Sequence, residues 1–216
     1  MHLIAVNASP RKNGNTAELI AHAIAGAESE GASAETIQLS EMQFSGCSSC
    51  FACKRAGRTG GIRCFMSDWL TPVLEKIGRA DALIIGTPVY IGNIASSASA
   101  FIERFMFPYI SYAEGPPSLF SGKKPVGFLV TLGAPEERAR SMGYTDVPER
   151  MAAMAKMLFG EAECVFTFDT TQFGDYSNYA ASRFDPAHKA QVRRDAFRAD
   201  CASAFEMGRR FARFSG

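Results

Sequence analysis

Short apolar runs alternate with stretches of helical periodicity along this chain, and that alternation restricts the fold more than any other feature. The run at 82–86 (ALIIG) is continuously apolar, which is typical of a strand covered on both faces of a sheet. Strands that alternate with helices indicate βαβ units and a parallel sheet. We predict strands at 3–6, 34–39, 82–86, 125–132 and 162–168, and helices at 15–29, 68–78, 97–107, 147–159 and 186–214.

Five such strands suit an α/β, doubly wound parallel sheet in the order 2-1-3-4-5, with helices on both faces. In that architecture ligands bind outside the carboxyl ends of the strands, at the switch point between the first and third strands. The chain of 216 residues is long enough for one domain with a full core, and we predict a single domain over 1–216. Two segments stand apart within it: a cysteine-rich loop at 44–65 and a long C-terminal helix at 186–214.

Composition excludes several classes of function. The formal net charge is +1 with 23 basic and 22 acidic residues, so no bulk field recruits nucleic acid or a membrane surface. No apolar stretch approaches the length of a bilayer span, and no secretory leader is expected. We therefore expect a cytoplasmic protein whose six cysteines are thiols or metal ligands rather than disulfides.

The turn after the first strand, NASPRKNGNT at 7–16, is rich in hydrogen-bond donors and ends where a helix begins. Unsatisfied N–H groups and the dipole at a helix N-terminus attract a phosphate. Gly14 permits close approach, and Asn15 with Glu18 suits a capping box. An alternative is a well-capped turn without a ligand. Neither a nucleoside-triphosphatase loop nor a dinucleotide fingerprint is present, so a single terminal phosphate, as on FMN, fits best. Side-chain donors to it come from Ser9, Asn13, Asn15 and Thr16.

A second motif comes after the third strand and reads TPVYIGN at 87–93. It combines an aromatic, two aliphatic residues, a glycine and an amide, which suits the face and edge of a planar heterocycle. The alternative is an ordinary turn with Tyr90 on the surface. Topology brings this loop beside the donor-rich turn, and the pair favours cofactor binding.

These residues resemble the flavodoxin-like NAD(P)H-dependent FMN reductases, including their iron–sulfur flavoprotein branch. The matching segments are SPRKNGNT at 9–16, CSSCFAC at 47–53, and ADALIIGTPVYIGN at 80–93 leading into FIERF at 101–105, within about the first 135 residues. The resemblance implies three sets of FMN contacts. The phosphate would be held by Ser9, Arg11, Asn13, Gly14, Asn15 and Thr16. The isoalloxazine would be lined by Pro88, Val89, Tyr90, Ile91, Gly92 and Asn93, and its far side closed by Thr131, Leu132 and Gly133.

The cysteines at 47–64 leave three interpretations open. Cys47, Cys50 and Cys53 are each separated by two residues, and Cys64 comes after ten more. Such spacing can wrap a [4Fe-4S] cluster, as in the iron–sulfur branch, although the fourth cysteine of that branch usually comes sooner. The thiols can equally be structural, or hold zinc in a tetrahedral site. Cys164 and Cys201 fall in strand and helix patterns and are expected to be small buried side chains.

The resemblance implies an FMN-dependent NAD(P)H oxidoreductase that passes electrons to a small-molecule or redox-protein acceptor. Because the flavin carries the chemistry, no catalytic acid or base is assigned. The three histidines are scattered and share no motif with a carboxylate or cysteine. The alternatives are an electron carrier without NAD(P)H turnover and a regulatory protein that senses FMN. The broad apolar face of the last helix suggests a homodimer or homotetramer.

Overall fold

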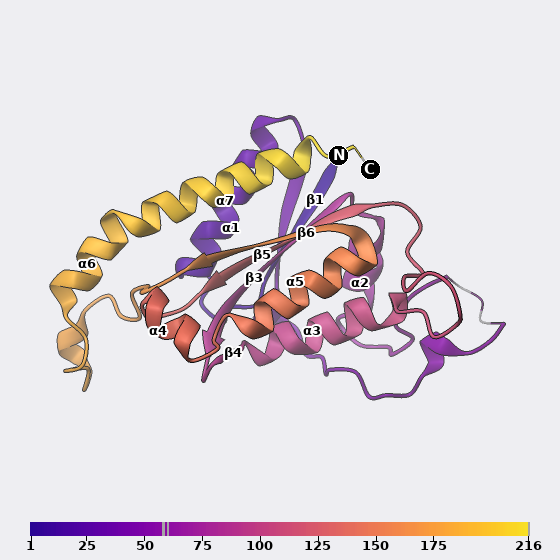
Figure 1. The fold of residues 1–216 in the computed structure, drawn as a ribbon, viewed down its shortest axis with the longest axis horizontal. Helices are drawn as coiled ribbons and strands as arrows, with labels where there is room; N and C mark the ends of the chain where they lie inside the picture. The colour runs from indigo at the N-terminus through magenta and orange to yellow at the C-terminus, as the bar shows by residue number, and fades with distance from the viewer. Residues whose placement is uncertain (58, 60, 216) are drawn as a thin grey trace.

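The computed structural model describes residues 1–57, 59 and 61–215, which form a twisted sheet between two layers of helices (Figure 1). Five parallel strands lie in the order β2-β1-β3-β5-β6, and the short β4 pairs antiparallel with β3 beside them. This is the predicted 2-1-3-4-5 order, so the doubly wound, flavodoxin-like prediction is confirmed. The strands are β1 (His2–Asn7), β2 (Ser33–Gln38), β3 (Ala82–Tyr90), β4 (Asn93–Ile94), β5 (Lys124–Thr131) and β6 (Gly160–Thr167).

Helices cover both faces of the sheet. The first and last helices pack together on one face, and α2, α3 and α5 lie on the other (Figure 1). The helices are α1 (Asn15–Ser29), α2 (Thr71–Arg79), α3 (Ser96–Met106), α4 (Glu136–Ser141), α5 (Asp146–Phe159), α6 (Pro186–Arg194) and α7 (Ala196–Ala212).

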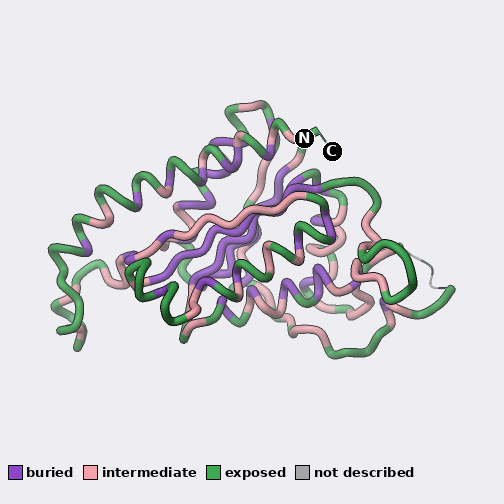
Figure 2. The backbone as a smooth tube through the Cα atoms, in the orientation of Figure 1, coloured by how far each residue is buried: buried purple, intermediate pink, exposed green. Residues whose placement is uncertain are grey.

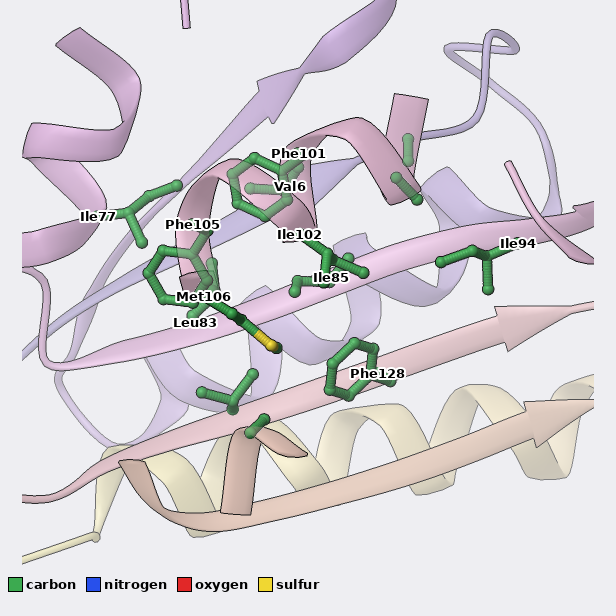
Figure 3. Close-up of a cluster of buried hydrophobic side chains, with 14 of the residues drawn as sticks. Val6, Ile77, Leu83, Ile85, Ile94, Phe101, Ile102, Phe105, Met106 and Phe128 are labelled. Carbon is green, nitrogen blue, oxygen red and sulfur yellow. The ribbon is translucent and has the colours of Figure 1, made fainter. Parts of the chain in front are cut away.

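Alternation along the strands divides the core into two clusters. In β1, Leu3 and Ala5 join the cluster under α1 and α7, whereas Ile4 and Val6 join the cluster under α2, α3 and α5. The central strands are largely purple in Figure 2 because both faces are covered. Figure 3 shows the second cluster, where Phe101 and Phe105 of α3 pack with Ile85 and Phe128 of the sheet. Burial on this scale is what keeps the strand ends fixed relative to one another.

Two predicted helix boundaries are wrong for local reasons. The helix expected at 68–78 begins at Thr71, because the carboxylate of Asp68 accepts the Leu70 N–H at 3.0 Å and ends the preceding turn. Trp69, two residues before this helix, is 65% exposed. The helix expected at 186–214 is broken at Asp195, which ends α6 and precedes α7.

The apolar face of the last helix is core rather than open surface. Its members pack against α1 and the sheet: Phe197, Cys201, Ala204, Met207 and Phe211. The face that suggested a homodimer or homotetramer is therefore used within the chain, and the oligomeric state stays a prediction. Within the described residues, the helices all fall short of the length and apolarity that crossing a bilayer requires.

Candidate functional site

The three predicted cofactor segments lie together at the carboxyl ends of the central strands. Asn7 at the end of β1 pairs with Gly86 of β3, and farther along β3 Pro88 pairs with Thr131 at the end of β5. The hydroxyls of Thr16 and Thr131 are 2.8 Å apart, which ties the start of α1 to the end of β5. Segments distant in sequence are thus brought together at the carboxyl ends of the strands, where this topology places ligands.

The donor-rich turn holds its own shape through buried side chains. Ser9 is buried; its N–H donates to Asn7 Oδ1 at 3.0 Å and its Oγ accepts the Arg11 N–H at 3.2 Å. Thr16 is buried as well and bonds to Thr131. Both hydroxyls are engaged inside the protein, so Arg11 and Asn13, which are exposed, are the more accessible donors of the turn.

A hollow of about 370 Å³ opens beside this turn. Its other wall comes from the segment after β6, because the Arg11 guanidinium donates to the Gln172 carbonyl at 2.5 Å and the Asn15 amide donates to the Thr171 carbonyl at 2.9 Å. The sequence did not assign this wall. Thr171 and Gln172 lie beyond the last strand without a motif, and their position beside the turn depends on the sheet order. The hollow is lined by Arg11, Asn13, Gly14, Asn15, Glu18, Thr171, Gln172, Phe173, Gly174 and Arg193.

The predicted capping box is wrong. The N-cap of α1 is Gly14 without a side-chain cap, and Asn15 is already helical. Arg193 of α6 takes both polar partners: it donates to Asn15 Oδ1 at 3.2 Å and pairs with the Glu18 carboxylate. The two side chains of the predicted box are therefore bound by a cation from the far end of the chain and do not cap the helix.

The second predicted loop is a β-hairpin. Tyr90 of β3 pairs with Asn93 of β4, and the two residues between them have positive φ: 51° at Ile91 and 75° at Gly92. Positive φ is unusual and strained for a β-branched residue, and Ile91 is fully exposed there. A Cβ at Gly92 would lie 3.0 Å from Tyr144 Cε1, so glycine also lets that ring pack on the turn. The hairpin presents an apolar tip at the same edge as the turn.

The remaining hairpin residues form its base. Pro88 is buried, and its carbonyl accepts the Ala95 N–H at 3.1 Å. Val89 is half-buried against the core formed with α2, α3 and α5. The base is rigid and the tip is open, which suits contact with a flat ring.

The third predicted segment ends β5 with its polar groups engaged. The Leu132 N–H donates to the Thr167 carbonyl at 3.0 Å, its carbonyl accepts the Thr170 N–H at 3.0 Å, and its side chain is buried. The Gly133 carbonyl accepts from Lys189 Nζ at 2.9 Å. Leu132 therefore has no free backbone hydrogen-bonding group to offer a ligand, and its backbone could contact one only by van der Waals packing.

An unpredicted ionic group adjoins Gly133. Asp169 has φ of 53° and is buried; its carboxylate pairs with the ammonium of Lys189, which is also buried, and accepts from His188 Nε2 at 2.6 Å. His188 shares no sequence motif with a carboxylate, and the fold nevertheless brings it to one. The pair spans 19 residues and a change of element, so no local spacing could reveal it. The group borders a hollow of about 560 Å³ that Tyr144 also lines.

The cysteine loop buries Cys53, whereas Cys47 and Cys64 are partly exposed. Burial raises the pKa of the Cys53 thiol, and the nearby thiols of Cys64 and Cys47 raise it further, against the opposing effect of Lys54. Cys50 is exposed. Among the described residues, the loop sulfurs form no group of three within 4.8 Å of one another, whereas zinc holds its thiolates about 3.8 Å apart. The sulfurs as placed are too far apart for one ion to bind three of them. Four thiolates are also the donor set of a [4Fe-4S] cluster, in which each thiolate binds a separate iron.

The cysteine loop and the hairpin also share a hollow of about 560 Å³. Cys47 and Ser49 line one side, Asn93 lines another, and the methionines Met151 and Met154 of α5 complete the wall. One candidate metal ligand, Cys47, and one candidate ring contact, Asn93, therefore lie on one cavity.

Glu18, His22 and Cys201 place ligand atoms within 4.8 Å of one another between α1 and α7. Glu18 is already paired with Arg193, and Arg194 lines the adjoining hollow. Cations in these positions oppose the binding of another cation, so we assign no metal there.

The comparisons with known proteins agree with this geometry. The family model of the NADPH-dependent FMN reductases matches residues 1–144. Among curated proteins, an iron-sulfur flavoprotein of Archaeoglobus fulgidus is 36% identical over 104 residues, which are 48% of this chain and 48% of that protein. An iron-sulfur flavoprotein of Methanocaldococcus jannaschii is 32% identical over 104 residues, covering 48% of this chain and 51% of its own length. The chain thus spans about half the length of these relatives.

Solved structures extend the likeness of fold to the whole chain. An NAD(P)H:quinone oxidoreductase from Methanothermobacter marburgensis superposes with a TM-score of 0.70 at 17% identity, covering 100% of this chain and 99% of the other. An FMN-dependent NADH-azoreductase from Bacillus anthracis, solved with FMN, has a TM-score of 0.64 at 13% identity, with 96% and 99% coverage. At these identities the likeness concerns the fold, whereas the family model covers about two thirds of the sequence. The chain belongs to the NADPH-dependent FMN reductase family.

Proposed function

We propose that this protein is an FMN-dependent NAD(P)H oxidoreductase that passes electrons to a small-molecule or protein acceptor. The observation that carries the proposal is the convergence of the donor-rich turn, the 88–93 hairpin and the end of β5 on one sheet edge. When bound, FMN supplies the redox chemistry by accepting a hydride and releasing electrons to an acceptor. The chain's task is to bind and orient both partners.

The donor set fits the phosphate of FMN. Arg11 and Asn13 are exposed on the hollow beside the N-terminus of α1, whose first N–H groups are unsatisfied within the helix. The hairpin fits the ring, since Tyr90 and Ile91 are exposed apolar side chains on a rigid base. The site therefore pairs a cationic, hydrogen-bonding end with an apolar end, as a flavin mononucleotide requires.

Substitution in the turn tests the phosphate assignment. Ser9 and Thr16 hold the turn itself, so the exposed donors are the cleaner targets. We expect Arg11→Ala with Asn13→Ala to weaken FMN binding by ten-fold or more, about 1.4 kcal/mol, because charge-assisted hydrogen bonds to the phosphate are lost. Lys12→Ala is the matched control, since Lys12 pairs with Glu41. Flavin fluorescence titration measures the FMN affinity of the wild-type protein, the double variant and the control. Equal affinities of the wild-type protein and the double variant would refute the assignment.

Anaerobic mixing of the FMN-loaded protein with NADH or NADPH tests turnover. Bleaching of the flavin by either nucleotide, with recovery when an acceptor is added, is the expected result. A loaded protein that keeps its full flavin absorbance in the presence of both nucleotides contradicts the enzyme assignment.

A second candidate function is an iron–sulfur flavoprotein electron carrier without NAD(P)H turnover. The specific observation in its favour is that Cys47 lines a hollow shared with the hairpin, while Cys53 and Cys64 belong to the same cysteine loop. These thiols, with exposed Cys50, fit the donor set of a [4Fe-4S] cluster better than that of zinc. Iron and sulfide analysis with a visible spectrum of anaerobically purified protein tests occupancy. Full iron with no bleaching by nicotinamide, but reduction by ferredoxin, would favour the carrier.

A further inference from the structure

The fourth cysteine of the loop requires an anchor that the sequence does not show. Ten residues separate Cys53 from Cys64, and three of them are glycines. A segment of this length pays conformational entropy to return its end to a fixed point. Cys64 nevertheless lies beside α3, the helix that Cys47 also contacts.

Arg104 of α3 provides that anchor. Its side chain is fully buried, and its Nε donates to Cys64 Sγ at 2.9 Å. The rest of the guanidinium is fixed: it donates to both oxygens of Asp68, at 2.7 Å and 3.1 Å, and to the Ser45 carbonyl at 3.1 Å. The orientation of the Nε–H toward the sulfur is therefore set by a bidentate pair that cannot rotate without losing hydrogen bonds.

The same helix holds the first and third cysteines. The carboxylate of Glu103, the neighbour of Arg104, accepts the Cys47 N–H at 3.0 Å. Lys54, the residue after Cys53, donates to the Ile110 carbonyl at 2.6 Å, just beyond α3. The loop is thus attached at two points to α3 and at a third to the segment just after it, and each attachment lies at or next to a cysteine.

We propose that Arg104 is a positioning residue that fixes Cys64 as the fourth thiolate ligand of a [4Fe-4S] cluster. In this role it compensates for the long sequence separation between the third and fourth cysteines, which is usually shorter in the iron–sulfur branch. The inference rests on the iron–sulfur part of the proposed function. The hydrogen bond from the Arg104 Nε–H to the ligand sulfur also stabilises the thiolate charge, which favours the reduced cluster and raises its reduction potential.

Reconstitution of the full chain with iron and sulfide under anaerobic conditions tests this role. Wild-type protein should bind four irons per chain. The double variant Arg104→Met with Asp68→Leu removes the buried ion pair as a unit, so no unpaired charge remains. We expect it to lose one iron per chain and to show an electron paramagnetic resonance signal in the oxidised state that wild-type protein lacks.

Two further variants separate positioning from general stability. Arg104→Lys keeps a cationic donor and should restore part of the fourth iron. Arg63→Ala is the matched control: it removes an exposed arginine next to Cys64 that pairs with Glu75, and it should leave iron and spectrum unchanged. FMN affinity, measured on every variant, reports whether the fold persists.

The outcomes are distinguishable. If the double variant keeps four irons and the wild-type potential and spectrum, Arg104 has no positioning role, although the redox function stands. If wild-type protein binds no cluster, or its thiols form a disulfide instead, the inference fails while FMN binding can still hold. If wild-type protein binds a cluster but no FMN, the proposed oxidoreductase function fails separately.

Discussion

At the scale of single residues, Lys124 is a buried lysine whose ammonium group binds the C-terminal end of a helix. The side chain is buried, and its Nζ donates to the Ile77 carbonyl at 2.6 Å at the end of α2. Burial lowers its pKa from 10.5 to about 8, and the nearby Asp81 opposes that effect only in part. The ammonium group of Lys124 thus stabilises the C-terminal end of α2. Its removal from water, however, costs free energy.

The lowered pKa of Lys124 gives stability a pH dependence. Between about pH 8 and 10.5 the unfolded chain keeps this proton while the folded chain releases it, so the free energy of unfolding rises with pH. Relative to Lys124→Met, wild-type protein should gain up to ~3 kcal/mol across this window. Urea unfolding of both proteins at several pH values measures the difference. Two curves that stay parallel from neutral to alkaline pH would contradict it.

Cysteine reactivity should differ by position. Burial raises the pKa of Cys164 to about 12, which leaves almost no thiolate at neutral pH, whereas Cys50 is exposed. In the metal-free folded protein, iodoacetamide should modify Cys50 and spare Cys164, as read by peptide mass spectrometry. In urea both should react. Equal labelling of the two in the folded state would show that β6 does not protect its thiol.

At the scale of elements, the crossing of α1 and α7 is closer than their sequences suggest. A Cβ at Gly208 of α7 would lie 1.8 Å from the Ala23 carbonyl oxygen of α1. Ion pairs also hold the two helices together at the C-terminal end of α1, where Glu30 accepts from Arg209 at 2.8 Å and from Arg213. The pair therefore packs backbone against backbone, which fixes the start of α1 beneath the donor-rich turn.

Gly208→Ala should be destabilising for this reason. Alanine favours a helix over glycine by about 1 kcal/mol, but the clash is with backbone, which cannot move aside without separating the two helices. We expect a net loss of ~2 kcal/mol in the free energy of unfolding. Gly174→Ala is the control, because nothing lies within 4 Å of a Cβ there. Thermal or urea unfolding measures both, and a more stable Gly208→Ala protein would refute the close crossing.

Some local sequence patterns predict an element correctly whatever its tertiary contacts are, and others do not. Apolar runs predicted the central strands β1, β3 and β5, because a strand covered on both faces must be apolar whatever its neighbours. The capping box at Asn15 failed, since Arg193 offers those side chains a partner from another helix. The hairpin at Ile91 and Gly92 was expected as a loop, because isoleucine at positive φ contradicts the usual turn preference.

At the scale of the whole molecule, the C-terminal helices complete the domain. Phe197, Met207 and Phe211 of α7 are buried over the sheet face that carries Leu3 and Leu129. Each such side chain contributes about 1.5–3 kcal/mol on burial, against a total stability of about 5–15 kcal/mol for a typical domain. The family model ends at residue 144, yet one face of the sheet is covered by helices beyond that residue.

A chain of residues 1–185 should accordingly fail to unfold cooperatively. It retains the donor-rich turn, the hairpin and the cysteine loop but loses the cover of one sheet face and the Arg193 contact to Asn15. Calorimetry should show no sharp transition, and FMN should not bind stoichiometrically. A cooperative transition in the truncated chain would show that α6 and α7 are accessory.

The sequence alone determined the sheet, its strand order and the two motifs at its carboxyl edge, because period and apolar content act through local geometry and topology rules. Only the tertiary structure decided the wall formed by Thr171 and Gln172, the Asp169–His188 pair and the anchor of Cys64 by Arg104. Those contacts join residues far apart in the chain, and their partners are selected by packing, which no short-range pattern encodes.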